Sequence, residues 1–239
     1  MNVTVLHLMD RIMERQLDGR ASRMLRQSIE EKGINIITEA NTEALIGKDG
    51  HVNQVRLKDG TVLDADLVVF AVGIRPNIAL AQSAGLRCNR GILVNDTMQT
   101  FDPSIYAVGE CIEHRNQTFG LVEPLWGQAF ICATHLAEHG SLTFKSPTVP
   151  TQLKVSGVDV FSAGNFEPKE DYEDIILNDE KRQIYKRIII QKDKVIGAVL
   201  FGDTEDGMWY AELIADQTPI STFRNKLLFG KDFAMKKAG

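Results

Sequence analysis

The stretch DPSIYAVGECIEH, residues 102–114, holds the feature that decides the fold class. Residues 105–108 are apolar, the pattern of a buried strand, and they are followed at once by Gly109 and Glu110. A glycine lets another group approach the backbone closely, or it permits a tight turn. An acid just past the C-terminal end of a parallel strand lies where open α/β sheets bind their ligands. Taken alone, these residues fit either such a ligand edge or an acidic surface turn.

Composition narrows the class of protein. The chain has 239 residues, 44% hydrophobic and 25% charged, which is ordinary for a globular protein. Its net charge of -5, with Lys and Arg scattered, gives no indication of nucleic-acid or lipid binding. No apolar run approaches the length that spans a membrane, and the N-terminus is no signal peptide, so we expect a cytoplasmic location.

The cysteines indicate no metal chemistry. Cys88, Cys111 and Cys132 are far apart, with no CxxC motif and no His at zinc spacing. This argues against a structural zinc, an iron–sulfur cluster and a redox-active disulfide within the chain. We expect most of the three thiols to be buried, and no metal site.

Hydrophobic periodicity and turn signals predict the order of elements. Two KDG turns, at 48–50 and 58–60, predict a three-stranded meander, and a turn at Lys192-Asp193 predicts a further hairpin. Strands are predicted over residues 3–8, 34–38, 42–46, 52–57, 66–72, 91–95, 104–108, 158–166, 183–191 and 194–202, and helices over 22–32, 77–84, 124–138, 206–215 and 222–229.

A stretch of Ser and Pro suggests a domain boundary. Residues 146–150, SPTVP, read as a linker, and the character of the chain changes beyond them. We therefore expect a domain boundary near residue 145.

The front of the chain raises a question about the nucleotide site. The strand VTVLHL at 3–8, followed by a helix and a meander, is typical of the second strand of a dinucleotide-binding unit. Such a unit also needs a first strand, a glycine-rich turn and a helix whose N-terminus holds the pyrophosphate. No G-x-G-x-x-G occurs in the chain. We therefore expect either a fragment of a longer protein or a unit without its nucleotide-binding half.

Three blocks in order resemble the FAD-dependent pyridine nucleotide-disulfide oxidoreductases. VTVLHLMDRIMERQLD (3–18) resembles the segment after their NAD-binding glycine motif, and GTVLDADLVVFAVGIRPN (60–77) resembles their A-x-G-x-x-P-N signature. TFDPSIYAVGE (100–110) resembles their second FAD motif, with Gly-Glu in place of Gly-Asp. The resemblance implies an α/β fold: a truncated, Rossmann-like flavoprotein with FAD- and NAD(P)-binding domains, followed by a small α+β C-terminal domain. The divisions that it implies are the C-terminal part of an NAD(P)-binding domain, the C-terminal part of an FAD-binding domain, a small α+β interface domain and a tail, at 1–77, 78–145, 146–229 and 230–239.

Within this family, HLMDRIMERQLD and TQLKVSGVDVFSAGNF (151–166) look most like the flavoprotein part of the NAD(P)H-dependent nitrite reductase large subunit. That resemblance implies electron transfer from NAD(P)H through FAD to downstream iron–sulfur and siroheme centres, which reduce nitrite to ammonia. Those centres need cysteine clusters that are absent here. We expect the isolated chain to hold FAD poorly and to be inactive.

The resemblance assigns the flavin site. It puts Glu110 on the ribityl or pyrophosphate edge of FAD, with Gly109 allowing close approach, although the added methylene of Glu can shift the contact or make it water-mediated. It also points the N-terminus of the helix near Pro124 at the flavin ring, where the helix charge favours the anionic reduced flavin. Leu125, Trp126 and Gln128 are then expected near the flavin, with core packing as the alternative for Trp126.

The crossing between the two nucleotide domains corresponds to residues Ala71, Val72, Gly73, Arg75 and Pro76 in the resemblance. Gly73 is expected to approach a ligand or a neighbouring segment closely. Two partners remain open for Arg75, a phosphate group or the carboxylate of Asp66.

The nicotinamide site is expected near residue 7. Family members that use NAD usually carry an acid at the end of this strand, which binds the ribose 2′-hydroxyl, whereas this chain has His7. Arg11 and Arg15 follow and are candidates to bind a 2′-phosphate; a solvated helix-end charge is the alternative for Arg15. NADH and NADPH both stay open, and no residue is expected to act as acid, base or nucleophile, because the cofactors carry the hydride chemistry.

Three hypotheses for the function stay open, and they differ in the partner that each one needs. The first is the nitrite reductase flavoprotein part. The second is a flavoenzyme that reduces rubredoxin, ferredoxin or another small redox carrier, and the third is a non-catalytic interaction module. Expected partners are missing parts of the same polypeptide or a redox protein, with a homo-oligomer left open. Trp209 and Tyr210 are either a contact surface of the C-terminal domain or part of its core.

Overall fold

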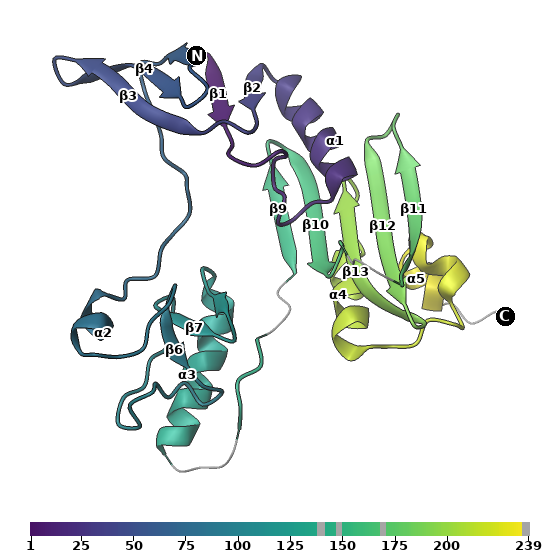
Figure 1. Cartoon of the computed structure of the whole chain (residues 1–239). Helices are drawn as coiled ribbons and strands as arrows, with labels where there is room; N and C mark the ends of the chain where they lie inside the picture. Colours follow the sequence, from purple (N-terminus) through teal and green to yellow (C-terminus); the bar gives the residue numbers. More distant parts are fainter. Residues whose placement is uncertain (138–141, 147–149, 168–170, 236–239) are drawn as a thin grey trace. The chain divides into compact units, whose positions relative to one another are not determined.

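The computed structural model describes residues 1–137, 142–146, 150–167 and 171–235 of the chain. It is a mixed α/β structure that divides into two compact units. Unit 1 combines Met1–Val68 with Thr148–Gly239, and unit 2 is Val69–Pro147. Each unit is described by itself (Figure 1).

The first part of unit 1 is a strand–helix–strand motif followed by a meander. Helix α1 begins after Asp18, whose carboxylate caps it by accepting a hydrogen bond from the Ala21 N–H at 3.0 Å. It ends before Gly33, whose φ of 80° suits glycine. Strands β1 and β2 pair in parallel, and β3, β4 and β5 form the antiparallel meander. The bounds are β1 Val3–Leu6, α1 Gly19–Glu30, β2 Ile34–Ile37, β3 Thr42–Lys48, β4 His51–Leu57 and β5 Val62–Asp64.

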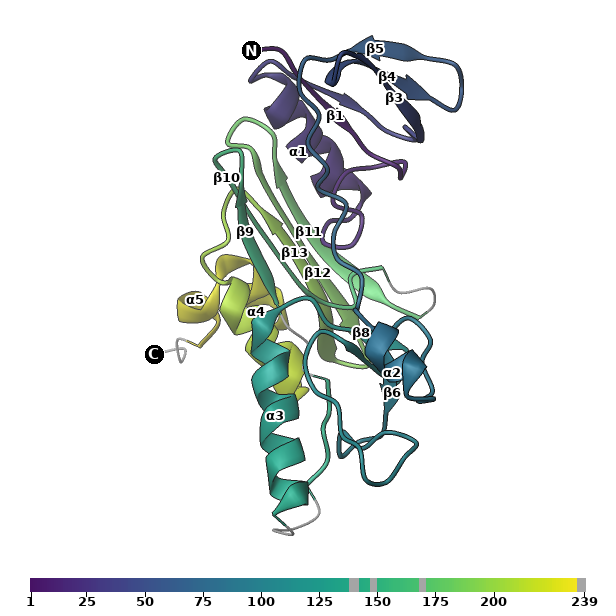
Figure 2. The ribbon, with the colours of Figure 1, turned by 90° about the vertical axis from the view of Figure 1, so that its left-hand side faces the viewer.

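The rest of unit 1 is a five-stranded antiparallel sheet in the order β11-β12-β13-β10-β9. One face packs on α4 and the C-terminal helices around the fully buried Tyr210. The other face packs on α1, where Leu25 meets Val199 and Phe201 (Figures 1 and 2). The bounds are β9 Thr151–Val155, β10 Val158–Gly164, β11 Glu173–Asp179, β12 Ile184–Gln191, β13 Lys194–Phe201, α4 Gly207–Asp216, the 3-10 helix η1 Arg224–Phe229 and α5 Lys231–Met235.

Burial on both faces explains why β12 and β13 have nearly continuous apolar sequences. Strands covered on two sides carry apolar residues in succession rather than in alternation. Trp209 and Tyr210 are buried in the core under α4, so they do not form a contact surface. The Tyr210 hydroxyl donates a hydrogen bond to the Leu227 carbonyl at 2.7 Å, which ties α4 to η1.

Unit 2 is built on a small sheet and one long helix. Strands β6 and β7 pair in parallel, and β8 adds antiparallel to β7. The core holds Met98, Ile112, Ile131 and Phe144, all buried. The bounds are α2 Ala79–Ser83, β6 Ile92–Val94, β7 Ile112–His114, β8 Gln117–Thr118 and α3 Val122–Leu136.

Two predicted strands are wrong. Residues 66–72 belong to no helix or strand, because the third meander strand forms earlier, at β5, directly after the turn at Gly60. Residues 104–108 double back on the preceding loop instead of forming a strand: Ala107 N–H donates to the Met98 carbonyl at 3.0 Å, and Tyr106 makes one bridge with Gln99.

Other differences concern edges and ends. Strands β9 and β11, the two outer strands of the large sheet, were not predicted, because their exposed faces interrupt the apolar pattern. Residues 231–235, expected to lie in a tail, form α5, in which Ala234 is buried. Part of the predicted linker, residues 147–149, and the predicted helix end at 138 lie outside the described residues.

Candidate functional site

The contact between Gly109 and Gln128 organises the predicted flavin edge. Gly109 has a φ of 100°, a conformation that favours glycine, and its N–H donates to Gln128 Oε1 at 2.8 Å. Gln128 is fully buried, and its Nε2 has no hydrogen-bond partner within the described structure. A buried amide donor without a partner is costly, so this nitrogen indicates a place for an acceptor from outside the chain. Glu110 is exposed beside it.

Helix α3 begins without a side-chain cap. Leu121 is the N-cap residue and accepts no hydrogen bond through its side chain, so the first N–H groups of α3 have no capping partner among the described residues. Leu125 is partly buried against the core of unit 2. Trp126 is 73% exposed, so core packing is the wrong interpretation for this side chain.

A buried carboxylate supports β7, the strand that begins just after the Gly109-Glu110 turn. Glu113, on β7, accepts hydrogen bonds from Asn89 Nδ2 at 3.1 Å, from Arg90 N at 2.8 Å and from Gly91 N at 3.2 Å. Burial alone would raise the pKa of Glu113, but these donated hydrogen bonds outweigh burial and lower it. The ionised side chain therefore fastens the loop before β6 to β7.

The neighbouring residue His114 connects β7 to Asp96, in the loop after β6. His114 Nε2 lies 2.8 Å from Asp96 Oδ1, and Arg115 binds the same carboxylate at 2.6 Å. The His114 ring also packs edge-on against Phe144. The turn that carries Gly109 and Glu110 is thus joined to β7, and the contacts of Glu113 and His114 hold that strand in place.

The crossing segment is exposed and irregular. Ala71, Val72, Gly73 and Arg75 are all exposed, and Gly73 has a φ of 79°. A Cβ atom added at Gly120 would lie 3.2 Å from Ile74 Cδ1, so the segment passes over the loop that leads into α3. Both partners proposed for Arg75 stay open.

The predicted nicotinamide residues lie in unit 1, after β1. His7 Nε2 is 3.1 Å from Glu14 Oε2, and Arg11 Nη2 is 2.6 Å from Glu167 Oε1. Arg15 is 86% exposed, and its Nε lies 3.8 Å from Glu14 Oε1. The residues after β1 therefore take part in two groups of charge contacts, one of His7, Glu14 and Arg15 and the other of Arg11 and Glu167.

The structure brings some of the predicted residues together and adds others. Gly109 and Gln128 touch, and His7 and Arg11 each gain a carboxylate partner. Sequence reasoning missed Glu14, Glu113 and Glu167. The carboxylate in the IEH strand was a visible signal for Glu113, whereas Glu167 is separated from Arg11 by 156 residues and left no local signal.

The described residues contain neither a metal site nor a membrane-spanning helix. Among them, no group of three or more His, Cys, Asp or Glu side chains is placed to hold a metal ion. None of the helices that the structure describes has the length and apolar character needed to cross a membrane.

Comparison with known families identifies two matching regions. The family model described as pyridine nucleotide-disulphide oxidoreductase matches residues 1–129. The model described as rubredoxin NAD+ reductase C-terminal domain matches residues 150–218.

Relatives and solved structures agree with these matches. The chain is 47% identical to a nitrite reductase [NAD(P)H] of Bacillus subtilis (strain 168) over 92% of its own length and 27% of the relative. It is 40% identical to the assimilatory nitrate reductase electron transfer subunit of the same organism, over 95% of its own length and 29% of the relative. A NAD-dependent persulfide reductase from A. fulgidus has a similar structure, with a TM-score of 0.80, 27% identity, and coverage of 94% of this chain and 46% of that one. The chain thus spans under a third of the two curated relatives.

Proposed function

This chain belongs to the pyridine nucleotide-disulphide oxidoreductase family, and we propose that it forms part of an NAD(P)H-dependent FAD oxidoreductase. FAD, when bound, supplies the hydride acceptor and passes electrons on one or two at a time. The residues of this chain bind, orient and shield that group. The single observation that carries the proposal is Gln128, which receives Gly109 N–H on one side of its amide and keeps a buried, unpartnered Nε2 on the other.

The proposed roles follow from local chemistry. Gly109 leaves room for the cofactor at the end of the turn, and the carboxylate of Glu110 accepts hydrogen bonds from sugar hydroxyls. The uncapped N-terminus of α3 places partial positive charge where reduced flavin carries negative charge. Leu125 and Trp126 provide apolar surface beside that helix end, and residues 71–75 form the approach from the nicotinamide-binding part.

We propose that the electrons leave for iron–sulfur and siroheme centres elsewhere in the same protein or a partner, and that nitrite is the final acceptor. Support comes from the 47% identity to a nitrite reductase [NAD(P)H]. We also propose a domain division near 145, supported by family matches that end at 129 and resume at 150, and a second division at 77. A cytoplasmic location is also proposed, because all three cysteines are free thiols.

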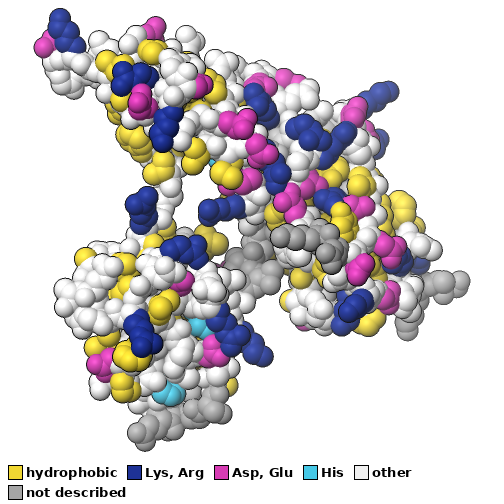
Figure 3. All heavy atoms as spheres, in the orientation of Figure 1, with side chains coloured by type: hydrophobic (Ala, Val, Ile, Leu, Met, Phe, Trp, Pro, Cys, Tyr) yellow, Lys and Arg dark blue, Asp and Glu magenta, His cyan; other side chains and the backbone are white. Residues whose placement is uncertain are grey.

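The last part of the proposal concerns the exposed apolar surface of unit 2 and the partner that covers it. Val122, Trp126 and Phe130 lie four residues apart along α3, on one exposed stripe of the helix. Exposed apolar side chains continue along residues 69–74, and hydrophobic side chains are visible on the surface of unit 2 in Figure 3. We propose that the remaining part of the FAD-binding domain, supplied by a longer polypeptide or a redox partner, covers this surface.

FAD titration tests the proposal. The chain has no G-x-G-x-x-G motif, so we expect it to bind FAD weakly and to show no oxidoreductase activity. A fusion that places before Met1 the N-terminal segment of the family, with both its FAD-binding and its NAD-binding glycine-rich motifs, should bind FAD with quenched flavin fluorescence. In that fusion, Gln128→Leu and Glu110→Ala should each weaken binding about tenfold or more, the equivalent of about 1.4 kcal/mol.

The matched controls are Gln152→Leu and Glu180→Ala, exposed positions on the large sheet of unit 1 and its turn. Both should leave FAD affinity unchanged. Equal affinity in the fusion and its Gln128→Leu variant would contradict the flavin site.

A further inference from the structure

The charged residues at the end of β1 form a set that can tell the two nicotinamide coenzymes apart. NADH and NADPH differ by a phosphate on the adenosine ribose, and in dinucleotide-binding units this ribose lies at the end of the second strand of the unit. We propose that Glu14 and Glu167 together make this site prefer NADH. The inference rests on the proposed function, because it assumes that the coenzyme binds at this strand end.

Glu14 restores the carboxylate that is missing from position 7. The loop after β1 turns back on itself, with Met13 at a φ of 53° and Leu17 N–H donating to the Met13 carbonyl at 2.8 Å. Ile12 and Leu17 are buried and anchor the loop in the core under α1. The loop thereby holds Glu14 Oε2 3.1 Å from His7 Nε2. A carboxylate in this place accepts a hydrogen bond from a ribose 2′-hydroxyl and repels a 2′-phosphate.

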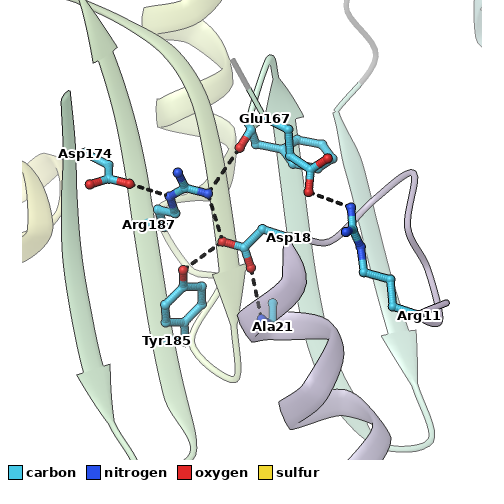
Figure 4. A network of polar contacts seen from close by, with 8 residues as sticks. Arg11, Asp18, Ala21, Glu167, Asp174, Tyr185 and Arg187 are labelled. Carbon is cyan, nitrogen blue, oxygen red and sulfur yellow. Dashed lines mark hydrogen bonds and ion pairs between the residues drawn. The ribbon is translucent and has the colours of Figure 1, made fainter. Parts of the chain in front are cut away.

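Glu167 forms an ion pair with Arg11, the arginine best placed to bind a phosphate. Arg11 is partly buried, and its guanidinium donates to Glu167 Oε1 at 2.6 Å (Figure 4). Its Nε is buried without a hydrogen-bond partner within the described residues. An arginine engaged by a carboxylate offers less positive charge to a 2′-phosphate than a free one. Arg15 is mostly solvated, so its charge is screened.

The strand end carries no excess of positive charge. Arg11 and Arg15 contribute two positive charges, and Asp10, Glu14 and Glu167 contribute three negative ones, with His7 counted as neutral. A 2′-phosphate would bring its negative charge into a site without excess positive charge, whereas a 2′-hydroxyl brings none.

Glu167 is held in place by the large sheet. It follows Phe166, whose carbonyl accepts a hydrogen bond from Arg187 Nη1 at 3.3 Å. Arg187 is fixed in turn by Asp18 at 3.2 Å and by Asp174 at 2.8 Å (Figure 4). The residue that engages Arg11 therefore belongs to the sheet domain after residue 150, and that domain takes part in coenzyme selection.

Binding of two small probes tests this inference without requiring turnover. The probes are 5′-AMP and adenosine 2′,5′-bisphosphate, which differ only in the 2′-phosphate, and the readout is the dissociation constant from NMR titration of the Arg11 and Arg15 side-chain Nε–Hε signals. The unsubstituted chain should bind 5′-AMP more tightly. Glu167→Gln should release Arg11 and shift the ratio of the two constants about tenfold toward the bisphosphate, and Glu14→Gln should shift it in the same direction.

Two further variants make the result specific. Glu180→Gln is the matched control, because Glu180, in the turn after β11, also forms an ion pair with an arginine, Arg20 of α1 at 2.8 Å, and it should leave the ratio unchanged. Arg11→Met combined with Glu167→Gln should remove the gain, since the released cation is then absent.

The outcomes separate the two claims. If both probes bind and neither glutamate variant changes the ratio, the inference is overturned and the proposed coenzyme site stands. If neither probe binds any variant, the coenzyme site itself fails, and the inference fails with it. Well-dispersed NMR spectra of each variant show that it is folded.

Discussion

At the scale of single residues, Asp18 joins two distant parts of the chain. It is only 4% exposed, caps α1 through Ala21, and accepts hydrogen bonds from the Tyr185 hydroxyl at 2.8 Å and from Arg187 at 3.2 Å. Burial, and then the nearby Asp18 carboxylate, raise the pKa of Tyr185, so the phenol stays a donor. We predict that Asp18→Ala lowers the free energy of unfolding of unit 1 by about 3 kcal/mol, because it uncaps α1, leaves the buried Tyr185 phenol without its acceptor and removes one of the two carboxylates that bind the partly buried Arg187.

Urea unfolding followed by Trp209 fluorescence measures this loss. Trp209 is buried in unit 1, and a Trp126→Phe background removes the exposed tryptophan of unit 2. Asp10→Ala, at an exposed aspartate before the same helix, is the control and should change stability by less than about 0.5 kcal/mol. A similar small effect for Asp18→Ala would show that the network carries little energy.

The second residue-scale prediction concerns acid. Hydrogen bonds from Arg115, and then from His114, lower the pKa of Asp96 to about 2. The pKa of an aspartate in the unfolded chain is about 3.9. Because the folded value is the lower one, the contribution to stability is fully present above about pH 4 and is lost as the pH falls through about 2.

A carbon-detected NMR titration of the Asp96 carboxyl group reports this pKa directly. Arg115→Gln should raise it toward the ordinary value, because it removes the largest cause of the shift. Arg75→Gln, at an exposed arginine of the same unit, should leave it in place. An unchanged pKa in Arg115→Gln would assign the shift to another group.

At the scale of elements, a close approach of two glycines shapes the large sheet. Gly164 on β10 faces Gly197 on β13, and a Cβ atom added at Gly197 would lie 2.2 Å from the Asn165 carbonyl oxygen. We predict that Gly197→Ala costs about 2 kcal/mol of unfolding free energy, because a central strand has no room to move. Gly19→Ala, in the first turn of α1 with space for a Cβ, should be neutral or slightly stabilising. Equal effects at both glycines, measured by urea unfolding, would contradict this account.

Elements set by neighbouring residues could be predicted from the sequence, whereas elements that need a distant partner could not. Hairpins at Asp49-Gly50, Asp59-Gly60 and Lys192-Asp193 were predicted correctly, because turn chemistry is local. The strand expected at 66–72 was not found, because an apolar run forms a strand only where another strand pairs with it. Among the site residues, the proximity of Gly109 to Gln128 required the packing of α3 against β7, which no local pattern encodes.

At the scale of the whole molecule, unit 1 is discontinuous, and residues 65–78 of the connecting segment belong to no helix or strand. Phe70 in this segment is 66% exposed, and Phe130 in α3 is similarly exposed at 63%. Proteases need extended, accessible backbone, so we predict that chymotrypsin cleaves after Phe70 before it cleaves after Phe130.

The two pieces should stay together after this cut. Residues 1–70 carry α1, whose buried face packs on the sheet formed by residues 150–201. The nicked protein should therefore run as two bands on a denaturing gel and as one peak in native gel filtration. Phe70→Thr should abolish the early cut. Separation of the pieces in gel filtration would contradict the continuous core across the two segments.

The order of most elements, the hairpin turns and the family could be predicted from the sequence, because they depend on residues close together in the chain. The pairing of charges, in contrast, emerges only from the packing of the folded chain. Glu167 reaches Arg11 and Arg187 reaches Asp18 across more than 150 residues, and Glu14 returns to His7 through a folded loop. Such contacts depend on how whole elements pack, since a charged side chain takes whichever partner the finished fold places beside it.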